Sequence, residues 1–268
     1  MNKLSPYLNE RKVKGQKILS LFATAGFPEI AATAPLVVAM AHAGADLIEI
    51  GIPFSDPVAD GPIIQHGSEV ALRNGISVAK IFDIIRQVKK ETDIPLVLMG
   101  YANPIFSYGM ERFLDDCAST GVGGTIVADL PYGEHEEYSC WSEQRSLATI
   151  FLAAPTTSDE RLKMLDRAST GFLYCVSITG VTGERPGLAS HATQFLRHVR
   201  QCATANAILV GFGITTPADV RLLASESDGV VIGSALMKCL SDSTNGQVIR
   251  SASGFVKTMR SALDSGEP

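Results

Sequence analysis

The stretch "DLIEIGIPFSDPVADGP", residues Asp46 to Pro62, runs from an apolar strand into an acidic loop. Residues 47–51 form an apolar run that is interrupted only by Glu49. A run that is apolar on both faces is typical of a strand in a parallel sheet covered by helices. A carboxyl group inside such a strand has to be paired, neutralised or used, because burying an unpaired charge is costly.

Eight short apolar runs of this kind occur along the chain: Ile18–Ala25, Asp46–Gly51, Pro95–Tyr101, Gly124–Leu130, Ala148–Ala154, Gly171–Ser177, Ala207–Gly213 and Asp228–Gly233. Segments with helical spacing separate them, for example "EIAATAPLVVAMAHAGA" and "SDERLKMLDRAST". Eight strand-then-helix units predict an α/β protein, a (β/α)8 TIM barrel. The alternative is an open doubly wound sheet, which usually has a GxGxxG turn after its first strand; "ATAGFPE" is not one.

The chain has no linker or low-complexity tract, so we expect one domain over residues 1–268. Leu4, Tyr7 and Leu8 have helical spacing and predict an extra N-terminal helix that closes the barrel floor. Two extra helices, at about 62–74 and 78–91, should follow the second strand, and another extra helix should lie near the eighth.

The composition excludes several classes of protein. The formal net charge of −5 offers no basic surface for nucleic acid. The chain has no apolar stretch of the ~18 residues that a membrane span needs, and its N-terminal residues lack the apolar core of a secretory signal. The five cysteines show no CxxC spacing. We therefore expect a cytoplasmic protein with reduced, mostly buried thiols and no disulfide or metal site.

Alternation along the second strand predicts the direction of Glu49. Ile48 and Ile50 suit the face that meets the helices, so Glu49 should point into the barrel near its C-terminal rim. It could be a core carboxylate paired with an inward base, but the eight strand runs contain no Arg or Lys. A desolvated glutamate has a raised pKa and can exchange protons near neutral pH.

Three aspartates are expected at the same rim, where barrel enzymes have their active sites. Asp60 lies in a stiff loop after the second strand, between "PFSDPVA" and "GP". An Asp before Gly is more often a turn former than a catalyst, and only its placement favours a catalytic role. Asp56 has the same ambiguity, and Asp129, after the fourth strand, cannot be separated from a structural role.

Glycine clusters follow the last two strands, in "LVGFGITTPAD" and "VVIGSALMK". Glycines let backbone N–H groups approach a ligand at a helix start, and barrels often bind phosphate at this corner. Neither loop has a Walker motif, which favours a small phosphate ester. The polar stretch 177–190 is either a plain loop or a hinged lid. Phe22 and Tyr174, late in their strands, are either core or flat walls for a planar substrate.

Six motifs closely resemble the α subunit family of tryptophan synthase: "FATAGFP", "DLIEIGIPFSDPVADGPIIQ", "YANPIFSYG", "GVTGERPG", "GFGITTP" and "IGSAL". The resemblance spans about residues 15–262. It implies a lyase of tryptophan biosynthesis that cleaves indole-3-glycerol phosphate to indole and glyceraldehyde 3-phosphate. It also implies a tetramer of two α and two β subunits, in which the β subunit carries pyridoxal phosphate and receives indole through a tunnel. No cofactor is implied on this chain.

Residue by residue, the resemblance makes Glu49 the general acid and base and Asp60 the second catalytic carboxylate. It implies an indole pocket of Phe22, Ile64, Leu98 and Tyr174, and a lid residue, Thr182, that bonds Asp60 on closure. The phosphate contacts that it implies are Gly183, Gly211, Gly213, Gly233 and Ser234. The face toward the β subunit is implied at Pro53, Asp56, Pro57, Asn103 and Pro131. Ile178 departs from the family, since some members have arginine there. That change affects the closed-state contacts of the lid and not the chemistry.

Three other functions stay open. One is a free-standing lyase that releases indole without a partner. Another is a barrel that has lost catalysis and only activates a β subunit; the presence of Glu49, Asp60 and both glycine clusters argues against it. The third is a phosphosugar isomerase on the same fold, which would need a different set of acids and bases at the rim.

Overall fold

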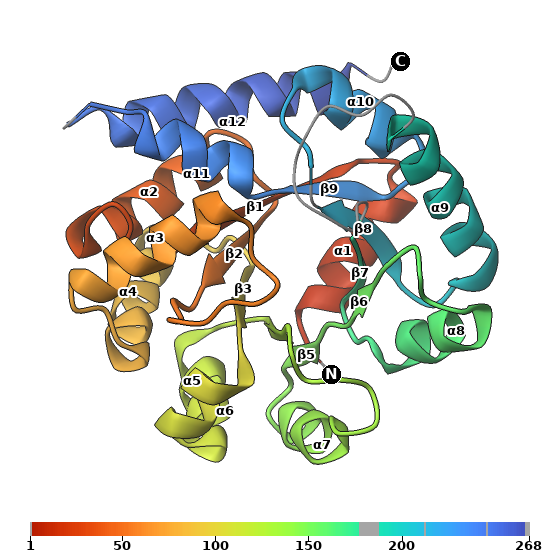
Figure 1. Ribbon diagram of the computed structural model, residues 1–268, viewed down its shortest axis with the longest axis horizontal. Coiled ribbons are helices and arrows are strands. Elements are labelled where there is room, and N and C mark those ends of the chain that lie inside the picture. Colours follow the sequence, from red (N-terminus) through yellow and green to blue (C-terminus); the bar gives the residue numbers. More distant parts are fainter. Residues whose placement is uncertain (1, 177–187, 212, 245, 266–268) are drawn as a thin grey trace.

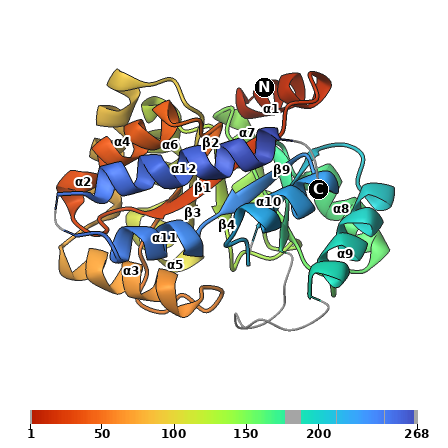
Figure 2. The same cartoon turned by 90° about the horizontal axis from the view of Figure 1, so that it is seen from above.

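Strands and helices alternate along the chain (Figures 1 and 2). The computed structural model describes residues 2–176, 188–211, 213–244 and 246–265. Its strands are β1 Ile18–Thr24, β2 Leu47–Gly51, β3 Leu96–Gly100, β4 Gly124–Val127, β5 Ala148–Thr149, β6 Leu152–Ala153, β7 Phe172–Val176, β8 Ala207–Gly211 and β9 Gly229–Ile232. Its helices are α1 Leu4–Val13, α2 Ile30–His42, α3 Pro62–Arg73, α4 Val78–Glu91, α5 Ala102–Tyr108, α6 Met110–Thr120, α7 Glu136–Gln144, α8 Asp159–Ala168, α9 Leu188–Cys202, α10 Pro217–Ser225, α11 Ser234–Ser241 and α12 Val248–Asp264.

The strands form one parallel sheet in the order β5-β4-β3-β2-β1-β9-β8-β7-β6. β5 and β6 stand at opposite ends of this order, yet only Ile150 and Phe151 separate them in the chain. The Ile150 N–H donates to the Thr125 carbonyl, and the Tyr174 N–H donates to the Phe151 carbonyl, both at 3.1 Å. β5 and β6 are therefore one interrupted strand, and through it the sheet closes into a barrel of eight strands.

The predicted (β/α)8 barrel is confirmed, including its extra helices. Each predicted strand is present, and most are shorter than predicted. β4, for example, ends at Val127 because the chain turns there, with the Leu130 N–H donating to the Val127 carbonyl. The predicted pair of helices after β2 corresponds to α3 and α4, and α11 and α12 follow β9.

The N-terminal helix α1 covers the floor of the barrel, as predicted. Leu4 and Leu8 on this helix are fully buried. A Cβ atom built on Gly171, just before β7, would lie 3.1 Å from the Leu4 side chain, and one on Gly123, just before β4, would lie 3.6 Å from it. Leu4 thus closes the end of the barrel where the strands begin, and the opposite rim is left for the loops that carry the acids.

A buried carboxylate joins this floor helix to the barrel wall. Asp46, just before β2, accepts a hydrogen bond from the Leu19 N–H at 2.8 Å. It also pairs with Arg11 of α1 at 2.7 Å and with Arg260 of α12 at 2.9 Å. Because it is compensated by two cations and an amide, this charge holds three separate parts of the chain together.

The strand register determines which side chains point into the barrel. Phe22 pairs with Glu49, which pairs with Val97, while Ile50 pairs with Leu98 and Gly51 with Met99. Neighbouring residues in register point to the same face of a parallel sheet, and successive residues alternate. The predicted inward direction of Glu49 agrees with this register.

The cysteines differ partly from the prediction of mostly buried thiols. All five are free, but only Cys117 and Cys175 are buried, and Cys140 is exposed. The other two, Cys202 and Cys239, are partly exposed because they lie on helices at the outside of the barrel. Among the described residues, no helix combines the length and apolar character needed to cross a bilayer.

Candidate active site

Glu49 is the most deeply placed acid of the barrel. It lies in the middle of β2 and is 0% exposed. Its Oε1 atom accepts a hydrogen bond of 2.8 Å from the Ser20 hydroxyl of β1, whereas its Oε2 atom is buried without a hydrogen-bond partner. Loss of solvation raises the pKa of Glu49 to about 8, against the opposing effect of the Ser20 hydrogen bond. At neutral pH the side chain is therefore mainly a neutral acid that can give up a proton.

Asp60 is the second acid at this rim, at the end of the loop that leaves β2. Burial raises its pKa to about 6, and a hydrogen bond with the Tyr101 hydroxyl opposes that shift. The same hydroxyl accepts a hydrogen bond from the Ala59 N–H at 3.1 Å, which fixes the loop against the end of β3. The two carboxyl groups differ in environment, so at pH 7 Asp60 is mostly ionised while Glu49 is mostly protonated.

A cavity opens at the C-terminal ends of the strands. Its walls include seven residues that the sequence predicts for the site: Phe22, Asp60, Ile64, Tyr174, Gly213, Gly233 and Ser234. The structure thus brings together an acid, an apolar wall and the glycine corner from five separate stretches of the chain. Glu49 is absent from this lining; it lies on the neighbouring strand β2, in register with Phe22, which does line the cavity.

The glycine corner presents the start of a helix to the cavity. Gly233 is the N-cap of α11, Ser234 is its first residue, and no side chain caps this end. The neighbouring helix α10 differs, since Thr216 and Asp219 form a capping box that satisfies its first N–H groups. Gly213 has φ of +77°, a conformation that glycine adopts most readily. The uncapped end of α11 is therefore the helix terminus suited to an anion.

Two glycines make room for the aromatic walls. A Cβ atom on Gly211 would lie 2.3 Å from the Tyr174 hydroxyl oxygen, and one on Gly51 would lie 2.5 Å from the Phe22 ring. Any larger residue at these positions would displace the rings. Burial raises the pKa of Tyr174, and the charges of Glu49 and Asp60 raise it further, which places this phenol within electrostatic reach of both acids. Gly211 thus supports the wall and does not itself line the cavity.

One predicted pocket residue is displaced by one position. Leu98 is buried but does not line the cavity, whereas its neighbour Met99 does. The cause is alternation along β3: Met99 is in register with the inward Gly51, so Leu98 faces the helices. Sequence reasoning also missed Ser20 and Tyr101, the partners of the two acids. Ser20 is two positions before Phe22 on β1 and therefore points into the barrel as Phe22 does, and this alternation could have revealed it.

Asp129 has a structural role. Its carboxylate is exposed and accepts a hydrogen bond of 2.7 Å from the Ala102 N–H, the first residue of α5. An acid at this position satisfies an otherwise unpaired N–H and complements the helix dipole. This contact favours the structural role among the two that the sequence left open for Asp129.

The residues predicted to face a partner divide into two groups. Asp56, Asn103 and Pro131 are exposed in loops and helices after β2, β3 and β4, whereas Pro53 and Pro57 are buried and offer no side-chain surface. The loop that carries the two prolines is held against the barrel, since the Ala59 N–H donates to the Tyr101 hydroxyl at 3.1 Å and the Asp60 N–H donates to the Pro57 carbonyl at 3.0 Å. Large apolar side chains missed by the prediction are exposed on the same segments: Val58 is 84% exposed and Phe106 is 52% exposed.

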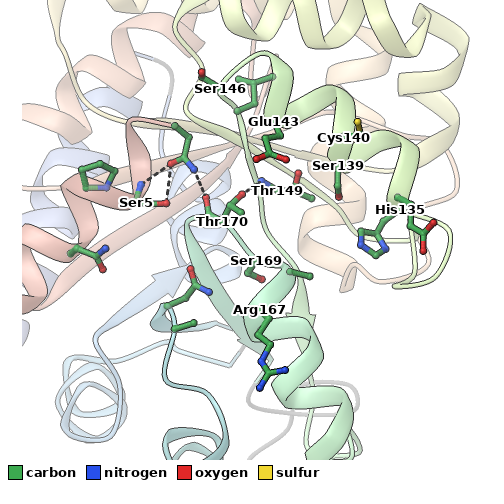
Figure 3. Close-up of a pocket in the computed structure, with 18 residues that line it drawn as sticks. Ser5, His135, Ser139, Cys140, Glu143, Ser146, Thr149, Arg167, Ser169 and Thr170 are labelled. Carbon is green, nitrogen blue, oxygen red and sulfur yellow. Dashed lines mark hydrogen bonds between the residues drawn. The ribbon is translucent and has the colours of Figure 1, made fainter.

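The predicted lid residues Thr182, Gly183 and Ile178 lie outside the described residues. A wider depression lies at the opposite end of the barrel, among α1, α7 and α8 (Figure 3). Most of the residues that line it are of polar type, among them Ser5, His135 and Arg167. Neither Glu49 nor Asp60 reaches it, and sites in barrel enzymes lie at the other rim.

Comparison with known proteins identifies the family. Residues 8–263 match the family model described as "Tryptophan synthase alpha chain". The chain is 41% identical over 263 residues to the tryptophan synthase alpha chain of Geobacter sulfurreducens, covering 98% of this chain and 99% of the relative. It is 43% identical over 251 residues to that of Geotalea daltonii, covering 94% and 93%.

A solved structure agrees with this result. The crystal structure of tryptophan synthase subunit alpha from Legionella pneumophila superposes with a TM-score of 0.89 at 34% identity, covering 99% of both chains. The match in fold and the match in sequence therefore extend over the same, nearly complete length. The chain belongs to the tryptophan synthase alpha chain family.

Proposed function

We propose that this chain cleaves indole-3-glycerol phosphate to indole and glyceraldehyde 3-phosphate as the α subunit of a tryptophan synthase. Family membership supports the reaction. One observation in the structure carries it: a buried, mainly protonated glutamate is in strand register with Phe22, a wall residue of a cavity that also has an ionised aspartate, a second aromatic wall and an uncapped helix start. These features match the acid, the planar ring and the phosphate that the reaction requires.

The reaction is a retro-aldol cleavage and moves two protons. A proton is added to C3 of the indole ring, and a proton leaves the hydroxyl on the adjacent side-chain carbon. The bond between these two carbons then breaks; its electrons return to the ring, and the side-chain carbon becomes an aldehyde. Glu49 can perform both transfers in turn, because a carboxyl group with pKa near 8 donates at neutral pH and accepts once it is ionised. Its carboxyl has to turn from Ser20 toward the cavity to do so.

Asp60 acts on the other side of the ring. Protonation at C3 places positive charge on the indole nitrogen, and a carboxylate near that N–H stabilises the charge. Asp60 lines the cavity and is mostly ionised at pH 7, in accord with this role. Phe22, Ile64 and Tyr174 hold the ring, with Met99 in the position first given to Leu98.

Phosphate binding at the glycine corner orients the reacting carbon. Gly233 and Ser234 present the start of α11, and Gly213 lines the same side of the cavity. Holding the phosphate there fixes the other end of the substrate against the two acids and makes proton transfer effectively intramolecular. Thr182 and Gly183 of the lid complete this site in the proposal.

The exposed rim after β2, β3 and β4 is the proposed docking face for a β subunit carrying pyridoxal phosphate. Asp56, Asn103 and Pro131 are exposed there, and Val58 and Phe106 add apolar surface of the kind that anchors a protein interface. A partner at this rim would stand over the cavity mouth and receive the indole. We place this assembly, two α and two β subunits, in the cytoplasm.

Indole release from indole-3-glycerol phosphate tests the proposal. The purified chain is assayed with and without a β subunit, for the wild type, Glu49→Gln and the surface control Glu10→Gln. We expect slow release that rises strongly with the β subunit, loss in Glu49→Gln by about 100-fold or more, and no change in the control. Fast release without a partner would indicate a free-standing lyase. No release in either condition would leave a barrel that only activates its partner.

A further inference from the structure

Helix α8 lies beside helix α9 on the outside of the barrel (Figure 1). Three side chains of different chemistry meet between them. They are Asp159, the first residue of α8, and His198 and Cys202, four residues apart near the end of α9. The His198 Nε2 atom lies 2.9 Å from Asp159 Oδ1 and 4.0 Å from Cys202 Sγ. All three donor atoms lie within 4.8 Å of one another.

The spacing of His198 and Cys202 puts both side chains on one face of α9, because residues four apart on a helix are neighbours. Asp159 approaches this face from α8. An imidazole nitrogen, a thiolate sulfur and a carboxylate oxygen are the three protein ligand types of zinc. The mixture of nitrogen and sulfur disfavours Mg²⁺ and Ca²⁺, which take oxygen ligands.

Two of the three distances between the ligand atoms are close to those of a tetrahedral zinc site, and the third, from sulfur to oxygen, is within 4.8 Å. With Zn–N near 2.0 Å and Zn–S near 2.3 Å, neighbouring ligand atoms stand roughly 3.3 to 3.6 Å apart. The nitrogen–oxygen distance of 2.9 Å has to open slightly, and the sulfur–nitrogen distance of 4.0 Å has to shorten slightly. Both changes are under about half an ångström, which a small side-chain rotation supplies.

We propose that Asp159, His198 and Cys202 bind one Zn²⁺ ion, with water as the fourth ligand. The ion tethers the start of α8 to the end of α9. The site is open to solvent, since the side chains of His198 and Asp159 are 44% and 56% exposed and Cys202 is half-buried. The expectation of no metal site rested on the spacing between cysteines; it did not consider a histidine and a cysteine on one helix joined by an aspartate from another.

The alternative is a hydrogen bond or ion pair between His198 and Asp159, with the Cys202 thiol nearby but binding no metal. Cobalt distinguishes the two, because Co²⁺ occupies zinc sites and a thiolate bound to it gives a near-ultraviolet charge-transfer band. The reduced full-length chain, freed of metal, is titrated with CoCl₂ and then with ZnCl₂. We expect one Co²⁺ per chain, the thiolate band, and its loss when Zn²⁺ displaces the cobalt.

Variants identify the ligands. Cys202→Ser removes the thiolate band, and His198→Ala weakens Zn²⁺ binding by at least about tenfold. The matched controls are Cys140→Ser, at an exposed thiol elsewhere, and His191→Ala, two turns earlier on α9; both keep the band and the affinity. A band that persists in Cys202→Ser, or the absence of a thiolate band in the wild type, would overturn the proposal.

A measurement on the wild type alone is independent of how the variants fold. Alkylation of each thiol is followed by mass spectrometry with and without ZnCl₂. Zn²⁺ should slow the alkylation of Cys202 at least tenfold, in line with occupancy of the site, and leave Cys140 unchanged. Equal alkylation of Cys202 in both conditions would refute the site.

Discussion

Replacing Glu49 with glutamine should make the protein more stable than the wild type at alkaline pH. Burial raises the pKa of Glu49 to about 8 in the folded protein, from an ordinary value of 4.5. Between these values the folded state holds a proton that the unfolded chain releases, so stability falls as pH rises through this window. At 1.36 kcal/mol per pKa unit, the wild type loses about 3 kcal/mol of unfolding free energy between pH 5.5 and 9. Glutamine does not titrate and avoids this loss.

The assay is urea-induced unfolding of both proteins, followed by circular dichroism at several pH values from 5.5 to 9. The quantity of interest is the difference in unfolding free energy between Glu49→Gln and the wild type, because other titrating groups cancel in it. A new unpaired amide in the variant costs about 1–3 kcal/mol at every pH, so it changes the offset and not the slope.

Glu10→Gln is the matched control. Glu10 is exposed, and a hydrogen bond from Lys14 lowers its pKa, so it is ionised throughout the range and its difference curve should be flat. Parallel curves for Glu49→Gln and the wild type, with a constant difference over the whole range, would refute the claim that Glu49 is protonated in the folded state.

Three further predictions follow from the same geometry. The pH profile of kcat/KM for indole release should rise near pH 6 as Asp60 ionises and fall near pH 8 as Glu49 loses its proton. Asp60→Asn should lower kcat/KM by about 100-fold or more and abolish the rise near pH 6. A rise that survives in this variant would contradict the assignment of Asp60. Gly211→Ala places a methyl group against the Tyr174 hydroxyl, so it should lower the unfolding free energy by about 1–3 kcal/mol and raise KM. Gly254→Ala is the control, because its methyl group meets no neighbouring atom; in the same unfolding and kinetic measurements it should have neither effect. Asp46→Ala leaves two arginines and an amide without their partner and should cost about 3–5 kcal/mol in urea unfolding; a loss under 1 kcal/mol would mean that water replaces the carboxylate.

Features with local causes could be predicted from the sequence. The eight apolar runs gave the barrel, and alternation along one strand gave the inward direction of Glu49. The glycine corner was also predictable, since close approach of backbone to a ligand calls for glycine at strand ends.

Features that depend on how separate strands meet could not be predicted. Met99 replaces Leu98 in the cavity because of its register with Gly51, which no local pattern in β3 reveals. The pairing of Asp60 with Tyr101 joins segments 41 positions apart, and the burial of Pro53 depends on how the loop after β2 is held against the barrel. Tertiary contacts between distant segments decide all three.

The interrupted strand between β4 and β7 makes one side of the barrel less extensively paired than the other. β5 and β6 span two residues each, whereas β1 and β2 share five registered pairs. Short pairings open locally at lower free energy, so amide hydrogens around Ile150 and Phe151 should exchange with solvent before those of β1. Around the ring, β1 lies farthest from this break. Local opening of the β5 and β6 pairings can therefore widen the barrel on that side. The hydrogen bond from Ser20 to Glu49 lies on the opposite, more extensively paired side and keeps its length.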